Sequence, residues 1–354
     1  MSRFFSDKYS SLKPYVPGEQ PKEMKYIKLN TNESPFPPSK KAIELATAEA
    51  AALNLYPDPT CEKLRLAAAA ALNISSDKII FTNGSDDILN FAFMAFCSPV
   101  APAVFPDITY GFYPVFAALN NIKTIVVPLK SDFTIDIDGL KKAKGTIFLA
   151  NPNAPTGIAL TRSEIEGIVK ADRNRLVVVD EAYVDFGAES CISLTDSYDN
   201  ILVVQTFSKS RSMAGARLGY AVGCKELIAD LETIRYSTNP YNINRMTMAA
   251  GIGALFDEKY FKDNISEIIS TREYVVEELK KMGMNVLPSK ANFVFASFPS
   301  ASGETIYTEL KKRGVLVRYF PGKRTKDYNR ITIGSRKQME IFIKVIKDIL
   351  EEVK

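Results

Sequence analysis

Short apolar runs alternate with helical patterns through the first two thirds of the chain. In a run such as LVVVD no polar residue comes before the last position, which is typical of a strand buried on both faces. The alternation predicts a mostly parallel sheet covered by helices on both sides. We expect its strands at 78–82, 103–105, 124–127, 146–150, 176–180, 201–206 and 220–223.

Other patterns lie on either side of this alternating region. Residues 1–35 are rich in proline and polar residues and predict an irregular arm, and helices are expected over 40–53, 62–72 and 88–96. After residue 240 a long helical region is expected over 242–282, with a break near 256–262. Further elements predict a smaller α+β domain, with strands at 292–298 and 329–334 and helices at 303–313 and 337–352.

The predicted organisation is therefore an arm and two domains. We expect an N-terminal arm at 1–35, a large domain at 36–245 and a small C-terminal domain at 246–354, the two domains being joined by the long helical region. The chain has 354 residues, which is enough for one large and one smaller domain.

Composition narrows the possible chemistry. The chain contains no histidine, which excludes Ser-His-Asp and Cys-His catalysis and any metal site built on histidine. Four cysteines are widely spaced without a CxxC pair, which argues against a zinc site or a disulfide framework and favours a reducing cytoplasm. No signal peptide or membrane span is expected, and the net charge of +4 is scattered, as on a solvated surface.

Polar residues follow several of the predicted strands. The sequence NGSD at 83–86 comes after one strand and NPNAPTG at 151–157 after another; Asp180 ends a third, and Ser208-Lys209 follows a fourth. Taken singly, Gly84-Ser85 fits a turn and helix cap equally well, Asp180 a structural cap and Lys209 a surface lysine. Ligands of parallel sheets bind beyond the carboxyl ends of the strands, where all of these residues are expected to meet.

Together these residue types match the requirements of pyridoxal phosphate (PLP). A buried carboxylate such as Asp180 keeps the pyridine nitrogen protonated, and the amine of Lys209 can bind the aldehyde as a Schiff base and then move protons. A helix start after Gly84 and the guanidinium of Arg217 suit the phosphate, helped by Ser85, Thr206 and Ser208.

Three motifs resemble those of fold-type I PLP-dependent aminotransferases, most closely the histidinol-phosphate aminotransferase family. They are NPNAPTG, VVVDEAYVDF and TFSKSRSMAGARLGYAVG, and the resemblance extends from PYVPG and KLNTNESPFPPS near the start to ITIGSRKQ near the end. The resemblance implies the PLP-dependent transferase fold, an α/β fold with a large, mostly parallel sheet and a smaller α+β C-terminal domain.

The resemblance also implies roles for individual residues. Lys209 resembles the Schiff-base lysine, Asp180 the partner of the pyridine nitrogen and Tyr183 the donor to the phenolic oxygen of the cofactor. Tyr110 resembles the ring that stacks on the cofactor, and Tyr56 a tyrosine that reaches the phosphate in the neighbouring subunit of a homodimer. The implied phosphate ligands are Gly84, Ser85, Asp86, Ser208 and Arg217. The implied substrate ligands are Arg336, Arg318, Tyr15 and Asn32, the last three of which fit a plain surface or arm role equally well.

One position departs from the family pattern. The family has asparagine immediately before Pro-Thr-Gly, where this chain has Ala154, preceded by Asn153. Either Asn153 replaces the missing donor to the phenolic oxygen of the cofactor, or Tyr183 holds that oxygen alone. Our hypothesis is that Asn153 compensates.

The function implied is transfer of an amino group between histidinol phosphate and 2-oxoglutarate, a step of histidine biosynthesis, by a cytoplasmic homodimer. An arginine anchor suits this pair, because guanidinium binds phosphate and carboxylate alike. An aromatic or broad-range aminotransferase and a threonine-phosphate decarboxylase remain alternatives. A PLP-binding regulatory protein is disfavoured because the arm is too short and too weakly basic for a nucleic-acid-binding segment, and the absence of GxGxxG disfavours a nicotinamide site.

Overall fold

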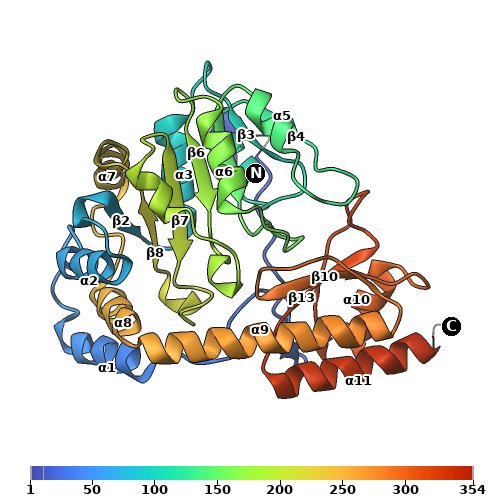
Figure 1. Cartoon of the computed structure of the whole chain (residues 1–354). Coiled ribbons are helices and arrows are strands. Elements are labelled where there is room, and N and C mark those ends of the chain that lie inside the picture. Colours follow the sequence, from blue (N-terminus) through green and yellow to red (C-terminus); the bar gives the residue numbers. More distant parts are fainter. Residues whose placement is uncertain (1, 11, 353–354) are drawn as a thin grey trace.

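The computed structural model describes residues 2–10 and 12–352, and its centre is a mostly parallel sheet (Figure 1). Within that part of the chain the sheet has seven strands in the order β2-β8-β7-β6-β5-β3-β4, with β8 antiparallel to both of its neighbours. The strands are β2 (Ile79–Thr82), β3 (Ala103–Pro106), β4 (Thr124–Val127), β5 (Thr146–Ala150), β6 (Val177–Asp180), β7 (Ile201–Thr206) and β8 (Gly219–Val222).

Helices cover both faces of this sheet, because the side chains of each buried strand alternate between two apolar layers. Val178, for example, packs with α3, α4 and α7, whereas the neighbouring Val177 and Val179 pack with α5 and α6. The helices of these layers are α3 (Ser85–Phe96), α4 (Tyr113–Leu119), α5 (Ile137–Lys142), α6 (Arg162–Lys170) and α7 (Lys225–Thr238). The α/β prediction is confirmed, and the predicted strand ranges agree with the observed ones to within one or two residues.

A third apolar cluster packs beside the β2–β8 end of the sheet. In this cluster, residues of β2 and β8 pack against α1 (Lys40–Glu49), α2 (Glu62–Leu72) and α8 (Arg245–Phe256). The chain then breaks at Asp257, whose carboxylate accepts the N–H of Tyr260 and so caps the start of α9 (Glu258–Lys281). Figure 1 shows α9 running from the side of α1 to the small sheet.

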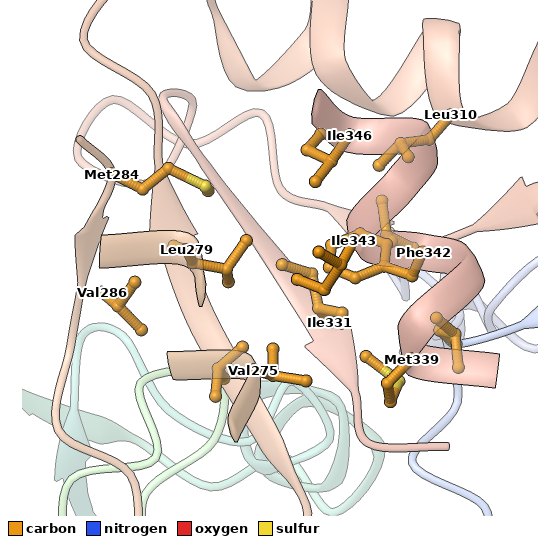
Figure 2. Packing of buried hydrophobic residues seen from close by; sticks show 14 of the residues in the cluster. Val275, Leu279, Met284, Val286, Leu310, Ile331, Met339, Phe342, Ile343 and Ile346 are labelled. Atoms are coloured by element: carbon orange, nitrogen blue, oxygen red, sulfur yellow. The ribbon is translucent and has the colours of Figure 1, made fainter. Parts of the chain in front are cut away.

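The C-terminal part is an antiparallel sheet packed on two long helices. Its strands follow the order β12-β13-β10-β9, and α9 and α11 lie against it (Figure 1). Figure 2 shows the apolar side chains of α9, α11 and β13, among them Val275, Ile331 and Phe342, which meet between the sheet and these helices. The elements are β9 (Asn285–Val286), β10 (Phe293–Ser297), α10 (Gly303–Lys312), β12 (Arg318–Tyr319), β13 (Tyr328–Thr332) and α11 (Arg336–Glu352).

The arm is attached to this C-terminal part. Strand β1 (Ile27–Lys28) pairs in parallel with β11 (Val315–Leu316), and the backbone carbonyl of Leu29 accepts the N–H of Thr332. Sequence patterning did not predict these two-residue strands, because two residues are too few to display a period. No helix within the described ranges is both long enough and apolar enough to cross a membrane.

Candidate active site

A cavity of about 640 Å³ lies at the carboxyl edge of the central sheet. Strands β2, β5, β6 and β7 deliver their last residues to this edge, and the arm and the small sheet close its other side. Most of the residues singled out from the sequence line this cavity: Tyr15, Asn32, Ser85, Asp86, Tyr110, Asp180, Tyr183, Thr206, Ser208, Lys209, Arg217 and Arg318.

The start of α3 forms one end of the cavity. Gly84 precedes the helix with a φ of 84°, a conformation that favours glycine, and a Cβ on it would lie 2.6 Å from Nη2 of Arg217, which would have to move. A Cβ on Gly219 would lie 2.4 Å from the backbone nitrogen of Ser85. The unpaired N–H groups of the helix start and the Arg217 guanidinium therefore share one small space, which suits a phosphate.

Hydroxyl groups at the end of β7 and just after it complete this end of the cavity. The Thr206 hydroxyl donates to Oγ of Ser208 at 3.0 Å, and Arg217 is held by Asp86 at 3.0 Å. Asp86 also accepts the hydroxyl of Tyr110 at 2.7 Å. Because one carboxylate orients both Arg217 and Tyr110, the guanidinium and the phenol ring have a fixed relative position on the cavity wall.

Asp180 is a buried carboxylate at the end of β6. Its Oδ2 accepts the hydroxyl of Tyr113 at 3.1 Å, and its Oδ1 accepts the backbone N–H of Ala182 at 3.2 Å. Burial raises the pKa of Asp180 to about 6, against these hydrogen bonds, which lower it. The carboxylate thus lacks a cationic partner in direct contact among the described residues, and a protonated ring nitrogen would supply one.

Lys209 follows β7 on the same wall. Its Nζ donates to the backbone carbonyl of Thr31 at 3.2 Å. Burial, and after it the positive charge of Arg330, lowers the pKa of Lys209 to about 8. An amine with a depressed pKa is a nucleophile near neutral pH, which is the property that reaction with an aldehyde requires.

Tyr183 faces the same space from the loop after β6. Its ring packs edge-on against Phe293, with centroids 5.0 Å apart, and its hydroxyl accepts Nδ2 of Asn32 at 2.9 Å. Burial raises the pKa of the Tyr183 phenol, so the hydroxyl keeps its proton and can donate it in a hydrogen bond.

Two arginines form the wall contributed by the small sheet. Arg318 and Arg330 are direct partners in the β12–β13 pair, and both line the cavity. Nε of Arg330 is buried and has no hydrogen-bond partner among the residues described. Its guanidinium lies 5.3 Å from the ring of Phe293 and 5.5 Å from that of Phe320. A guanidinium that lines a cavity and is incompletely paired suits an anion bound beside it.

The arm lies over these arginines. Arg318 donates to the backbone carbonyls of Val16 and Pro17 at 2.8 and 2.9 Å, and the ring of Tyr15 stacks on Phe112 with centroids 4.2 Å apart. The arm is therefore tied to both sides of the cavity mouth.

Arg336 does not join these residues. It begins α11, half-exposed, where its Nε donates to Glu340 at 3.2 Å and its guanidinium lies 3.4 Å from the ring of Tyr274. Near the C-terminal end of the small sheet, the arginine that lines the cavity is Arg330, which the sequence reasoning missed. A signal was available: in a strand over 328–332, Arg330 and Thr332 share the face opposite the apolar Ile331.

Asn153 also turns away from the cavity. Its Oδ1 accepts the hydroxyl of Thr109 at 2.8 Å, and its Nδ2 donates to the carbonyl of Ile108 and to Thr156. Ala154 is the neighbour that lines the cavity. Because the Asn153 side chain is hydrogen-bonded to Ile108, Thr109 and Thr156, it does not reach the cavity, where a donor to the phenolic oxygen would be needed. The hypothesis that Asn153 compensates therefore has no structural support.

Tyr56 is exposed over 79% of its surface and lies outside the cavity of its own chain. Its ring stacks on Tyr241, with centroids 4.7 Å apart, and its carbonyl accepts a guanidinium N–H of Arg245.

Tyr113, the donor to Asp180, was not predicted, because its position within an apolar helix gives no polar signal.

The donor set fits pyridoxal phosphate. A helix start with a guanidinium suits the phosphate, a buried carboxylate suits the ring nitrogen, and an amine with a lowered pKa suits the aldehyde. The guanidinium groups of Arg318 and Arg330, which line the cavity, add a place for a substrate anion beyond the cofactor.

Comparison with known proteins agrees with this geometry. The sequence profile of the family "Aminotransferase class I and II" matches residues 24–346. The chain is 49% identical to the histidinol-phosphate aminotransferase of Brachyspira hyodysenteriae over 99% of this chain and 100% of that protein. It is 46% identical to the enzyme of the same name from Clostridium botulinum over the full length of both.

Solved structures share the fold. The histidinol-phosphate aminotransferase of Sinorhizobium meliloti, solved in complex with pyridoxal-5'-phosphate, superimposes with a TM-score of 0.84 at 25% identity over 92% of each chain. The histidinol-phosphate aminotransferase of Clostridium acetobutylicum superimposes with the same TM-score at 22% identity, over 92% of this chain and 99% of that one.

Proposed function

Because the chain belongs to the family of class I and II aminotransferases, we propose that it is a PLP-dependent enzyme that transfers the amino group of histidinol phosphate to 2-oxoglutarate. The products are imidazole acetol phosphate and glutamate. The observation that carries the proposal is the Lys209 amine, with its lowered pKa, in the same cavity as the buried Asp180 and the paired Arg318 and Arg330.

The residues at the cofactor end of the cavity would bind and orient PLP. Ser85, Ser208 and Arg217 would hold the phosphate, Asp180 the protonated ring nitrogen and Tyr183 the phenolic oxygen. When bound, PLP supplies an aldehyde for the amino group and a ring that withdraws electrons from the substrate carbon. Asp180 loses its proton and gains stability when a cationic ring nitrogen lies beside it, since the opposite charge lowers its pKa.

Lys209 carries the proton. Its Nζ lies in the cavity beside the place of the cofactor, and its lowered pKa would let it take and return a proton there. This explains how a chain without histidine can perform acid–base chemistry. The tyrosines Tyr110 and Tyr113 keep their protons, because burial and nearby carboxylates raise the pKa of each.

The arginine wall selects the substrate. Histidinol phosphate and 2-oxoglutarate differ in shape but both bring an anion, and the guanidinium groups of Arg318 and Arg330 can bind phosphate or carboxylate. Tyr15 and the carbonyls of the arm that hold Arg318 cover the cavity mouth and exclude water.

We also propose a cytoplasmic homodimer in which Tyr56 reaches the phosphate of the partner subunit. Support comes from the exposed pair Tyr56 and Tyr241, next to the exposed Leu53 and Leu55, which together form an apolar surface on one chain. The proposed division into arm 1–35, large domain 36–245 and small domain 246–354 leaves the cavity between all three.

Two experiments test the proposal. Borohydride reduction followed by peptide mapping should find the pyridoxyl group on Lys209, and label on another lysine contradicts the assignment. Turnover is then measured with histidinol phosphate, phenylalanine and threonine phosphate. Histidinol phosphate should react fastest with 2-oxoglutarate; equal turnover of phenylalanine would indicate a broad-range enzyme, and carbon dioxide from threonine phosphate would indicate a decarboxylase.

A further inference from the structure

We propose that Asn32 orients the Tyr183 phenol toward the bound cofactor and that Thr332, on the small sheet, fixes the orientation of Asn32. Neither residue would touch the reacting atoms through this network, so both act as positioning residues. The inference rests on the proposed role of Tyr183 as donor to the phenolic oxygen of PLP.

Three hydrogen bonds join the residues into a chain. The Asn32 backbone N–H donates to Oγ1 of Thr332 at 3.0 Å, the Thr332 hydroxyl donates to Oδ1 of Asn32 at 2.9 Å, and Nδ2 of Asn32 donates to the Tyr183 hydroxyl at 2.9 Å. Asn32 and Thr332 are almost completely buried. Asn292 adds a fourth bond, from its Nδ2 to the Asn32 carbonyl at 3.0 Å.

The direction of these bonds follows from counting protons. A hydroxyl carries one proton, and Thr332 accepts the N–H of Asn32, so its own proton is free for Oδ1. Oδ1 is then the amide atom on the Thr332 side, and Nδ2 faces Tyr183. The phenol oxygen accepts from Nδ2 and keeps its single proton for another acceptor.

The opposite orientation of the amide would reverse this effect. If Oδ1 faced Tyr183, it would accept the phenol proton, and the phenol would no longer be a donor to the cofactor. Thr332 disfavours this rotation, because the rotated amide would present Nδ2, which cannot accept the Thr332 proton that Oδ1 accepts in the structure. The chain also polarises the phenol, since a hydroxyl that accepts a hydrogen bond becomes a stronger donor.

The residues next to Tyr183 in the cavity wall make its hydroxyl a more important donor. Ala154 packs in the same apolar cluster as Phe293 and Tyr183, and its methyl group lines the cavity without a donor. The side chain of Asn153, next in the chain, is bonded to Thr109 and Thr156 instead. Tyr183 is thus the polar side chain of this cluster, and its proton position matters correspondingly more.

Charged groups act on the phenol from several elements. Arg330 on β13 and Lys209 after β7 favour its ionised form, whereas Asp180 on β6 and Asp86 on α3 oppose it. None of them hydrogen-bonds to the Tyr183 hydroxyl in the described part of the chain. Asn32 is therefore the neighbour that sets the direction of the hydroxyl proton.

The test is the pH midpoint of the change in visible absorption of bound PLP, measured on the holoenzyme. A donor stabilises negative charge on the phenolic oxygen, which is greatest after the cofactor has lost its proton, so losing the donor raises the midpoint. Tyr183→Phe should raise it by about 1 to 2 pH units, the range expected for a hydrogen bond to a charged group.

Thr332 provides a matched pair of variants. Thr332→Val has nearly the shape of threonine but no hydroxyl, and it should raise the midpoint by about 0.5 pH units, a fraction of the Tyr183→Phe effect. Thr332→Ser keeps the hydroxyl and should leave the midpoint within about 0.2 pH units of wild type. A role in packing alone predicts the reverse order, because serine loses the methyl group.

Asn32→Gly provides an independent variant. Asn32 has a φ of 56°, a left-handed conformation that glycine adopts without strain, so the backbone is kept while the amide is removed. Its midpoint should lie between those of Thr332→Val and Tyr183→Phe. Urea unfolding of each variant identifies any that fails to fold.

The outcomes separate the two proposals. If Tyr183→Phe moves the midpoint but Thr332→Val does not, or if serine and valine move it equally, the positioning network is wrong and the proposed function stands. If Tyr183→Phe itself leaves the midpoint unmoved, the role assigned to Tyr183 is wrong and the network has no purpose.

Discussion

Arg318 and Arg330 lie directly opposite each other in the antiparallel β12–β13 pair, and both line the cavity. Like charges at directly opposed positions destabilise a sheet. The arm carbonyls that accept from Arg318 and the rings beside Arg330 offset part of that repulsion. A bound anion would offset the rest, so the pair is expected to be an unfavourable arrangement that substrate relieves.

Arg330→Gln should therefore weaken substrate use without preventing cofactor binding. The loss of one charged hydrogen-bond donor to a buried anion should lower kcat/KM for both substrates by about 10- to 100-fold. Arg336→Gln is the matched control, because Arg336 is half-exposed on α11 and paired with Glu340. Steady-state kinetics decide between them: a larger loss in Arg336→Gln would restore the anchor suggested by family resemblance.

The charge of Arg330 should also affect the pH at which the Lys209 amine becomes reactive. Burial is the main cause that lowers the pKa of Lys209 to about 8, and Arg330 is the next. The amine reacts only when unprotonated, so PLP capture by cofactor-free protein should accelerate as pH rises through about 8. In Arg330→Gln one lowering cause is absent, and the midpoint of capture, followed by stopped-flow absorbance, should move upward. A downward shift would mean that the arginine acts on the amine in another way.

Asp180→Asn should stabilise the cofactor-free protein and weaken PLP binding. Burial raises the pKa of Asp180 from 3.8 to about 6, so its contribution to stability is present below 3.8 and is lost as pH rises through about 6. Above that range the buried charge costs about 3 kcal/mol, which asparagine does not incur.

Urea unfolding without cofactor checks this expectation. Asp180→Asn should exceed wild type in stability at neutral pH and match it near pH 3, and PLP should stabilise wild type more than the variant. If wild type is the more stable protein at neutral pH without PLP, the carboxylate has a compensating partner that the geometry does not reveal.

The proposed sharing of sites between two subunits predicts complementation between two impaired variants. Tyr56→Ala should lower turnover and Lys209→Ala should abolish it. In a mixed dimer, one site combines the intact Lys209 of one chain with the intact Tyr56 of the other. Refolding the two variants together should thus give more activity than either alone. If Tyr56 serves the site of its own chain, mixing restores nothing, and sedimentation shows whether mixed dimers formed.

Local sequence was sufficient for the parts of the site that follow strands. Lys209, Asp180 and Gly84 lie within or directly after buried apolar runs, and the parallel arrangement of those runs brings their ends together. The site residues contributed by the small sheet were harder to predict. Arg330 and Arg336 are six residues apart in one basic segment. Alternation along the strand places Arg330 opposite the apolar Ile331, but the pairing with Arg318 on β12 is needed to show that this face lines the cavity.

Side-chain direction in loops was beyond prediction. Asn153 and Ala154 are adjacent, and the sequence gives no reason why the amide bonds to Thr109 while the methyl group faces the cavity. The bond from Tyr113 to Asp180 was hidden for a different reason, since a tyrosine among apolar helix residues resembles any core aromatic.

The parallel pairing of β1 with β11 has a consequence for the order of assembly. Residues 27–28 meet residues 315–316, so a ribosome must synthesise nearly the whole chain before that contact can form. Contacts between such distant segments form slowly, because a large loop must close first. The arm residues Thr31 and Asn32 follow β1, and they cannot take their places until the small sheet exists. During synthesis, the large domain therefore carries only its own wall of the cavity, open to solvent. The cavity becomes enclosed in the last stage of folding, when the arm and the small sheet take their places.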